Sequence, residues 1–218
     1  THPAMIRSLG MIKKACAMAN HECGHLDDER TGYIIAACDE IIQGKLDCWF
    51  ITDVIQGGAG TSTNMNANEV VANRAAQLAG KALGVYDYIH PNDHVNFGQS
   101  TNDVFPTAGK LTALFLVEDL LEELMLLQEA LLDKSIEFND VIKLGRTHLQ
   151  DAVPIRMGQE FHAFATAIVR DIRRIKVAFS NLKSVNMGAT AVGTGINTDE
   201  RYKRICVKHL CDITQIEL

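Results

Sequence analysis

The sequence contains little of what typifies β-rich, secreted or membrane proteins. Only four prolines are present, and aromatic residues make up 6% of the 218 residues. These low fractions favour a helical protein over a sandwich or a barrel. No run of about 20 apolar residues is present to span a membrane, and the first residues do not resemble a secretory signal peptide. We therefore expect a cytoplasmic protein that has no membrane partner.

Positive charge is also scarce, and the cysteines do not occur in metal-binding pairs. The 21 lysines and arginines are outnumbered by 27 aspartates and glutamates, for a formal net charge of −6. No nucleic acid partner is expected, although a few local donors can still bind an anion. The cysteines show no CxxC spacing, so we expect buried reduced thiols and assign no metal ligand, a zinc site being the weaker alternative. They are Cys16, Cys23, Cys38, Cys48, Cys206 and Cys211.

Apolar residues recur at helical spacing along most of the chain. Two of these patterns, over residues 105–139 and 158–186, are long enough for a helical bundle. Shorter patterns predict helices over residues 4–22, 31–43, 66–82 and 198–211, with a loop over 50–65 and a turn over 90–93. The predicted fold class is all-α. We expect an N-terminal helical domain over residues 1–99 and part of a long central helical bundle over residues 100–218.

Three polar clusters interrupt this helical pattern. The first, over residues 57–64, joins glycines to hydroxyl side chains but lacks the lysine of a phosphate-binding P-loop. The second, over residues 100–103, has more polar side chains than a helix cap needs. The third places Thr147 and His148 between a glycine and a proline, where we expect them at the end of a helix. Caps and a structural histidine would explain each cluster alone. Together the clusters indicate neutral donors for a carboxylate and for charge that develops on it.

These clusters and their neighbours resemble motifs of the aspartase/fumarase superfamily. The matching segments are residues 56–70, 90–96, 99–103, 145–154, 158–161 and 188–198, so the resemblance runs along essentially the whole chain. The first segment contains Gly-Gly-Ala-Gly-Thr-Ser, a form typical of aspartate ammonia-lyases, whereas fumarases more often have a Gly-Ser-Gly-Thr version. The chain therefore resembles the aspartase branch most closely.

The resemblance implies a reversible anti-elimination in which L-aspartate gives fumarate and ammonia through an aci-carboxylate dianion. No cofactor is implied, and the sequence does not show whether a divalent metal activates the enzyme. In the resemblance, the β-carboxylate is bound and the dianion stabilised by Thr61, Ser100 and Thr101. The amino group or a nearby carboxylate is contacted by Asn102 and His148, and the substrate is supported by Thr147. The remaining two positions, His90 and Asn92, resemble a secondary dicarboxylate site.

The resemblance also implies a homotetramer, because in this superfamily the regions that form one site come from three subunits. The family's loop with the serine base and its substrate-binding lysine would lie beyond Leu218, so we expect a partial chain and assign no catalytic base within it. Two alternatives stay open. One is a fumarate hydratase acting on malate and fumarate, and the other is a catalytically incomplete fragment or structural relative.

Overall fold

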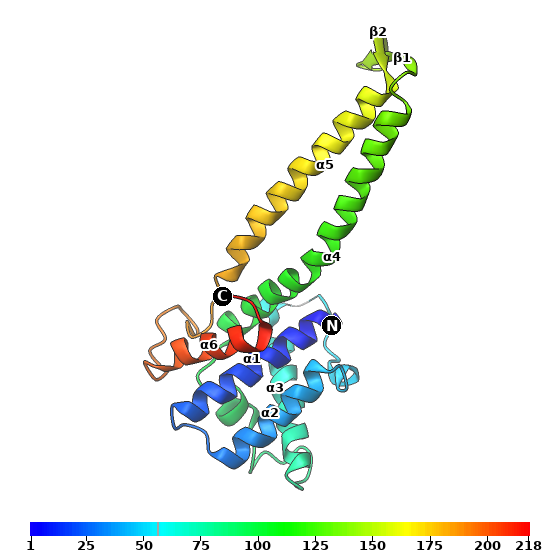
Figure 1. Cartoon of the computed structure of the whole chain (residues 1–218). Coiled ribbons are helices and arrows are strands. Elements are labelled where there is room, and N and C mark those ends of the chain that lie inside the picture. Colours follow the sequence, from blue (N-terminus) through cyan, green and yellow to red (C-terminus); the bar gives the residue numbers. More distant parts are fainter. Residues whose placement is uncertain (56) are drawn as a thin grey trace. The chain divides into compact units, whose positions relative to one another are not determined.

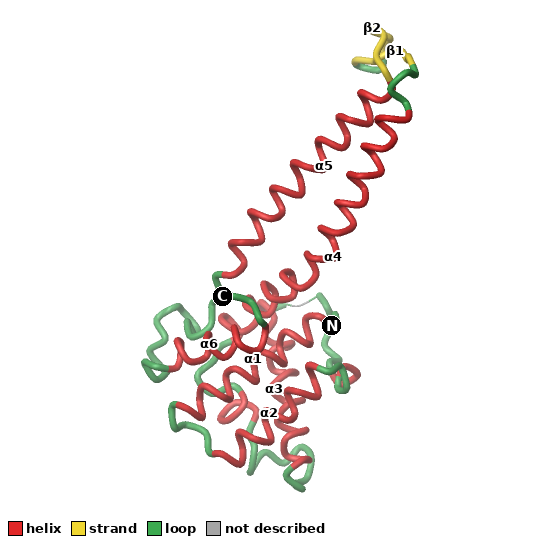
Figure 2. The backbone as a smooth tube through the Cα atoms, in the orientation of Figure 1, coloured by secondary structure: helices red, strands yellow, loops and turns green. Residues whose placement is uncertain are grey.

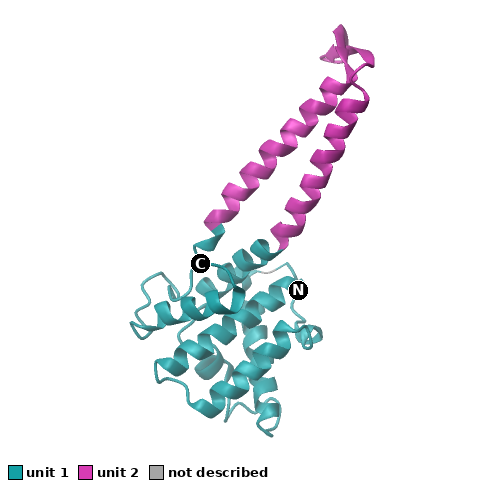
Figure 3. Ribbon diagram, in the orientation of Figure 1, with its two compact units in different colours: residues 1–115, 182–218 teal, residues 116–181 magenta. Residues whose placement is uncertain are grey.

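A computed structural model describes residues 1–55 and 57–218, which form two compact units (Figure 3). Unit 1 contains Thr1–Phe115 and Leu182–Leu218, and unit 2 contains Leu116–Asn181. Most of the described chain is helical, with one small two-stranded sheet (Figure 2), which confirms the all-α prediction. Gln56, the first residue of the first motif, lies outside the described residues. The predicted domains, 1–99 and 100–218, stay a prediction about organisation.

Five helices contribute to unit 1 among the described residues (Figure 1). They are α1 (Pro3–Glu22), α2 (Asp28–Ile42), α3 (Thr61–Leu78), the first part of α4 (Thr101–Glu137) and α6 (Tyr202–Thr214). Short helical turns cover Asp47–Trp49, Gly58–Gly60 and Pro91–Val95. The helix predicted over residues 66–82 therefore begins and ends earlier. Its first turn carries hydroxyl side chains that were assigned to the preceding loop, because such residues suit loops and helix starts equally well.

Helix α1 is the central element of unit 1, and it packs against α2, α3 and α6. Its buried side chains point in nearly every direction around the helix, which requires neighbours on all sides. Gly10 allows a close approach of α2, because a Cβ atom there would lie only 2.8 Å from Ile41 Cγ2. Lys13 is also fully buried in this apolar helix, so its charge needs polar partners inside unit 1.

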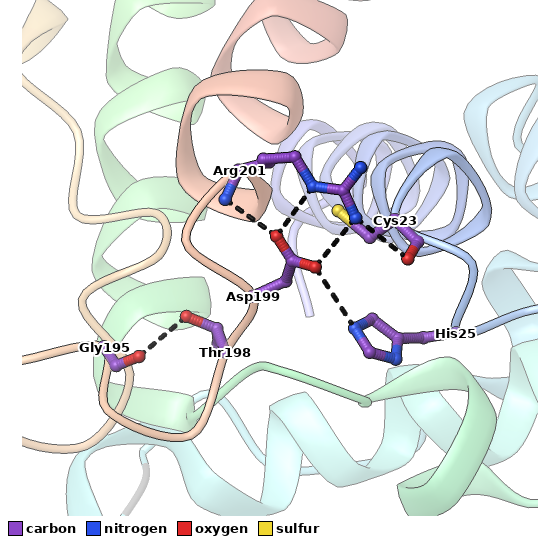
Figure 4. Close-up of polar contacts among 6 residues, drawn as sticks. All are labelled: Cys23, His25, Gly195, Thr198, Asp199 and Arg201. Atoms are coloured by element: carbon purple, nitrogen blue, oxygen red, sulfur yellow. Dashed lines mark hydrogen bonds and ion pairs between the residues drawn. The ribbon is translucent and has the colours of Figure 1, made fainter.

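An ion-pair cluster ties the segment before α6 to the end of α1 (Figure 4). The Asp199 carboxylate accepts hydrogen bonds from Arg201 Nε at 3.0 Å and from the Arg201 backbone N–H at 2.9 Å. Arg201 Nη2 also donates to the Cys23 carbonyl oxygen at 3.2 Å, and His25 Nε2 lies 3.7 Å from Asp199 Oδ2. The hydrogen bonds from Arg201 hold the pKa of Asp199 well below its usual value. The cluster therefore anchors one end of the loop over residues 188–199.

Unit 2 consists of the rest of α4, helix α5 (Met157–Ser180) and a β-hairpin between them. The hairpin pairs β1 (Ile142–Thr147) with β2 (Gln150–Arg156) in antiparallel register. Gly158 lies so close to α4 that a Cβ atom there would be 2.3 Å from the Ser135 carbonyl oxygen. The Phe138 and Phe161 rings pack with their centroids 5.6 Å apart. The prediction that Thr147 and His148 end a helix is wrong, because they belong to this hairpin.

The cysteine prediction is right for most positions and wrong for two. All six cysteines are free thiols, and four of them are buried: Cys16, Cys23, Cys38 and Cys206. Cys48 is exposed and Cys211 is half-buried. Cys48 lies in the short turn after α2 and Cys211 on the outer side of α6, where an apolar environment was expected from sequence alone. None of the described helices combines the length and the apolar character needed to cross a bilayer.

Gly10→Ala should lower the stability of the protein by about 1–2 kcal/mol, because the added methyl group overpacks the contact with Ile41. Gly32→Ala is the matched control. Gly32 also lies within a helix, α2, but nothing approaches its Cβ position within 4 Å, so alanine there should stabilise by up to about 1 kcal/mol. Thermal unfolding of both variants measures the difference, and a melting temperature raised equally by both would contradict the close packing of α1 on α2.

Candidate functional site

The Ser-Thr-Asn segment, residues 100–102, lies at the start of α4. Ser100 caps the helix: its Oγ accepts a hydrogen bond from the Asn102 backbone N–H at 3.2 Å. In the opposite direction, the Ser100 backbone N–H donates to Asp103 Oδ1 at 2.8 Å. This reciprocal pair is a capping box with aspartate as the acidic member. The positive end of the α4 dipole therefore coincides with these hydroxyl and amide side chains.

The loop over residues 188–199 is held against the Ser-Thr-Asn segment. Asn102 Nδ2 donates to the Ala191 carbonyl oxygen at 2.8 Å. The second carboxylate oxygen of Asp103 accepts from the Thr190 backbone N–H at 3.0 Å. Thr190 has a φ of 58°, a left-handed conformation that a β-branched residue rarely adopts. Asp103 thus fixes two backbone segments with one carboxylate.

The glycine loop, residues 57–60, places Thr61 at the start of α3. Gly58, Ala59 and Gly60 all have left-handed φ values, of 70°, 54° and 88°. A Cβ atom on Gly60 would lie 2.5 Å from the Phe105 ring of α4, so only glycine fits there. This contact brings the starts of α3 and α4 together. Thr61 is exposed, and its Oγ1 donates to the Gly58 carbonyl oxygen at 2.8 Å.

Polar side chains connect the two helix starts to the buried Lys13. Its Nζ donates to Asn96 Oδ1 at 2.9 Å and to Gln99 Oε1 at 2.8 Å. Asn64 Nδ2, from the first turns of α3, lies 3.3 Å from Asn96 Oδ1 and 3.3 Å from Thr101 Oγ1. Three of the sequence-predicted residues, Ser100, Thr101 and Asn102, therefore share one hydrogen-bonded region.

Burial shifts the pKa values of both charged groups in this region toward their neutral forms. It lowers the pKa of Lys13 to about 8. It also raises the pKa of the Asp103 carboxyl, while hydrogen bonds from the Ser100 and Thr190 backbone N–H groups and the charge of Lys13 act in the opposite direction. Each charge is therefore partly compensated by fixed polar partners, as burial of an ion requires.

His90 and Asn92 lie at a π-helical turn, Pro91–Val95, in unit 1. His90 Nδ1 accepts from the backbone N–H groups of Asn92 and Asp93, both at 3.2 Å. Asp93 Oδ2 also lies 3.3 Å from the same nitrogen. Because its Nδ1 accepts from both backbone N–H groups, we assign His90 as a cap of this turn.

Thr147 and His148 lie in unit 2, at the turn of the hairpin, and both are exposed. Thr147 pairs with Gln150, leaving His148 and Leu149 as a two-residue turn with φ values of 51° and 63°. Such a turn normally contains asparagine and glycine, because both residues have positive φ. Backbone strain of this kind is often retained at functional sites. The hairpin presents the imidazole of His148 to the surroundings.

No individual role was predicted from sequence for Lys13, Asn64, Asn96 or Asp103. A signal for Lys13 was available, because it lies one helical turn after Leu9 and two after Ile6 on the apolar face of α1. Charged residues are rarely found on such a face unless they are paired. The roles of the other three depend on contacts between distant segments, which spacing alone does not reveal.

Neutral donors at two adjoining helix starts are suited to binding carboxylates and similar anions. A family model described as lyase matches residues 3–217 of the chain. The chain belongs to this lyase family, within the aspartase/fumarase superfamily.

Individual relatives support the same placement. The chain is 56% identical over 209 residues to an aspartate ammonia-lyase from a Bacillus species, covering 96% of this chain and 45% of that protein. It is 48% identical to a class II fumarate hydratase from Halobacterium salinarum, covering 97% and 45%. A solved structure of a fumarate lyase:delta crystallin from Brucella melitensis bound to cobalt superposes with a TM-score of 0.94 at 49% identity, covering 99% and 47%. The chain spans about half the length of these proteins.

The stability that Lys13 contributes should rise with pH between about 8 and 10.5. The amine has a pKa of about 8 in the folded protein and its ordinary value of 10.5 when unfolded. In this interval the unfolded chain binds a proton that the folded protein has released, so the free energy of unfolding increases with pH. The total gain is about 3 kcal/mol. Denaturant unfolding at several pH values gives the free energy of unfolding of the protein and of Lys13→Met, and the difference between the two isolates this contribution. A difference that does not change with pH would contradict it.

Proposed function

We propose that the protein containing this chain is an aspartate ammonia-lyase, which converts L-aspartate reversibly to fumarate and ammonia. The main observation behind this proposal is that two helix starts, at Thr61 and at Ser100–Thr101, lie next to each other. They are joined by the Gly60–Phe105 contact and the Asn64–Thr101 hydrogen bond. Hydroxyl and backbone N–H donors at such positions suit a carboxylate. The identity to aspartate ammonia-lyases supports the choice of substrate.

In the proposed reaction, Thr61, Ser100 and Thr101 bind the β-carboxylate of aspartate. A base removes a proton from Cβ, and the electron pair moves onto the carboxylate to give an aci-carboxylate dianion. Donors already in place stabilise this second charge more than the first, which lowers the barrier. The C–N bond then breaks and ammonia leaves. The base is not assigned to any residue of this chain.

The remaining site residues bind the other end of the substrate. Asn102 and His148 contact the amino group or a nearby carboxylate, and Thr147 supports the substrate. His90 and Asn92 form a secondary dicarboxylate site.

The elimination involves no net oxidation or reduction, so the proposal includes no organic cofactor. We place the enzyme in the cytoplasm.

The proposed assembly is a homotetramer in which Thr147–His148 and the Ser-Thr-Asn segment of one site come from different subunits. The support is the large apolar surface of unit 2. Side chains along α4 and α5 that ordinarily lie in a core are 44–62% exposed: Leu116, Leu120, Met125, Leu126, Leu127, Phe164, Val169 and Val177. Apolar faces of this extent are normally covered by partners, and bundle helices from other subunits would supply that cover.

Fumarate hydratase is the second candidate, and the 48% identity to the Halobacterium salinarum enzyme favours it. The same donors would stabilise the same type of dianion, with hydroxide leaving in place of ammonia. The two functions therefore differ in what contacts the leaving group and not in the carboxylate site. Thr147 and His148 do not discriminate between them.

The experiment that tests the function is to incubate the full-length protein containing these residues with L-aspartate and, separately, with L-malate. Ultraviolet absorbance follows the fumarate formed. We expect fumarate from aspartate, and release of ammonia in equal amount. Fumarate from malate alone would establish the hydratase instead, and no fumarate from either substrate would contradict both candidates.

In the same assay, Ser100→Ala should lower kcat/KM for aspartate by about 30- to 1000-fold, equivalent to about 2–4 kcal/mol of lost transition-state stabilisation. Because Ser100 also caps α4, the variant should lose about 1 kcal/mol of stability. Ser100→Thr keeps a hydroxyl in both roles and serves as the control. A Ser100→Ala variant with full activity but lower stability would reduce Ser100 to a helix cap.

The assembly is tested by Leu120→Glu combined with Leu127→Glu, which places two charges on one face of α4. Both side chains are nearly half exposed in the single chain, at 47% and 45%, so the substitution should spare the fold but disrupt subunit contacts. We expect a tetramer by light scattering for the unaltered protein and a smaller species for the variant. Glu122→Gln, on the opposite side of α4, is the control. A monomeric unaltered protein would contradict the assembly.

A further inference from the structure

In the chain of hydrogen bonds that starts at Lys13, the chemistry of each group determines which one donates and which one accepts. The Lys13 ammonium has only hydrogens to offer, so the Asn96 side-chain oxygen that it contacts at 2.9 Å acts as an acceptor. Asn64 lies 3.3 Å from that same oxygen and must therefore present its NH2 group to it. The charge of one buried lysine thus fixes the orientation of a buried amide on another helix.

The orientation of Asn64 in turn decides what Thr101 can do. The same NH2 group lies 3.3 Å from Thr101 Oγ1, which consequently accepts. A hydroxyl that accepts from Asn64 keeps its own hydrogen for a different acceptor. That is the polarity needed for binding a carboxylate. With the opposite amide orientation, Thr101 would donate to Asn64 and present lone pairs to the anion.

Asp103 fixes the other side of the same segment. Its two carboxylate oxygens accept from the Ser100 backbone N–H at 2.8 Å and from the Thr190 backbone N–H at 3.0 Å. The side chain is fully buried, so water does not compete for these bonds. One carboxylate therefore sets the position of Ser100 and of the loop whose Ala191 carbonyl accepts from Asn102.

We propose that Lys13 and Asp103 are positioning residues that hold the Ser-Thr-Asn segment in its anion-binding arrangement before any ligand arrives. Lys13 acts through Asn96 and Asn64 on Thr101, and Asp103 acts on Ser100 and on the loop over residues 188–199. The inference rests on the proposed function, because it assigns the support for the same carboxylate site. Donors that are already oriented need no rearrangement as charge develops, which is where their effect on rate lies.

The principal variant is Asp103→Asn in the full-length protein. Asparagine keeps the size of the side chain but replaces one acceptor oxygen by an NH2 donor, so only one of the two backbone N–H groups can be satisfied. We expect amide hydrogen exchange of the ligand-free protein to be at least tenfold faster at Ser100 or Thr190, with exchange in α1 and α2 unchanged. We also expect kcat for aspartate to fall at least tenfold, with a smaller change in KM.

Asp27→Asn is the matched control. Asp27 also stabilises a helix start, as the N-cap residue of α2 that accepts from the Arg30 backbone N–H at 2.8 Å, and makes no contact with α4 among its hydrogen bonds. Its exchange effect should be confined to the start of α2, and kcat and KM should stay within twofold. Should Asp103→Asn fail to fold, exchange in the unaltered protein still decides. Unprotected Ser100 and Thr190 amides without ligand would overturn the proposal.

The Lys13 side of the proposal is tested by Asn64→Ala, with Asn73→Ala as its control on the same helix. Asn73 also makes side-chain hydrogen bonds, but they go to Tyr86, Glu69 and Gly84. We expect Asn64→Ala to weaken the binding of succinate, a dicarboxylate probe measured by calorimetry, at least fivefold, and Asn73→Ala to leave it unchanged.

The outcomes separate the inference from the function on which it rests. An unaltered protein that neither converts aspartate nor binds succinate would contradict the proposed function. A protein that does either, but whose Asp103→Asn exchange and kinetics match the unaltered form, would contradict the positioning role alone. Faster exchange at Ser100 with kcat/KM within twofold would also overturn it.

Discussion

Unit 1 depends on how one buried cation is accommodated. Lys13 lies in the middle of an apolar helix that is surrounded by other helices, and water cannot reach it. Its partners therefore had to come from the chain itself, and they come from the segment just before α4. This requirement links the central helix to the start of α4. The remaining polar contacts of the region, including those of Asn64 and Asp103, extend outward from that link.

A second constraint is the close approach of another segment to the backbone at a few glycines. Gly60 lies against the Phe105 ring, and Gly158 lies against the Ser135 carbonyl oxygen. The first brings two helix starts together in unit 1, and the second sets the spacing of α4 and α5 beside the hairpin in unit 2. In both cases the absence of a Cβ atom allows two segments to approach more closely than any other residue would.

Periodicity predicted α1 to within one residue at its start, because its apolar positions follow the helical repeat. It placed the start of α2 three residues too late, since Asp27 caps a first turn that has no apolar residues. It placed α3 too late, since Thr61 and its neighbours suit both loops and first turns. The hairpin was missed because Thr147 and His148 lack the Asn-Gly signal of a tight turn, and their φ values depend on the surrounding strands. The polar cluster over residues 100–103 stands out by its composition, whereas the roles predicted for Ser100, Thr101 and Asn102 came from the family resemblance. Ser100 is held locally by Asp103. The contacts of Thr101 with Asn64 and of Asn102 with Ala191 join residues far apart in sequence, which no local pattern encodes.

At the hairpin turn, the backbone strain at position 149 and the ionisable side chain at position 148 belong to different residues, so each can be changed without the other. Leu149 is 91% exposed and left-handed, and its side chain has no hydrogen-bonding role. His148, beside it, has the ionisable ring. A left-handed non-glycine residue costs about 1–2 kcal/mol, so replacing Leu149 by glycine would relieve that strain while the imidazole of His148 remains. The stability of the turn can therefore be adjusted at position 149 while the ionisable ring beside it stays in place.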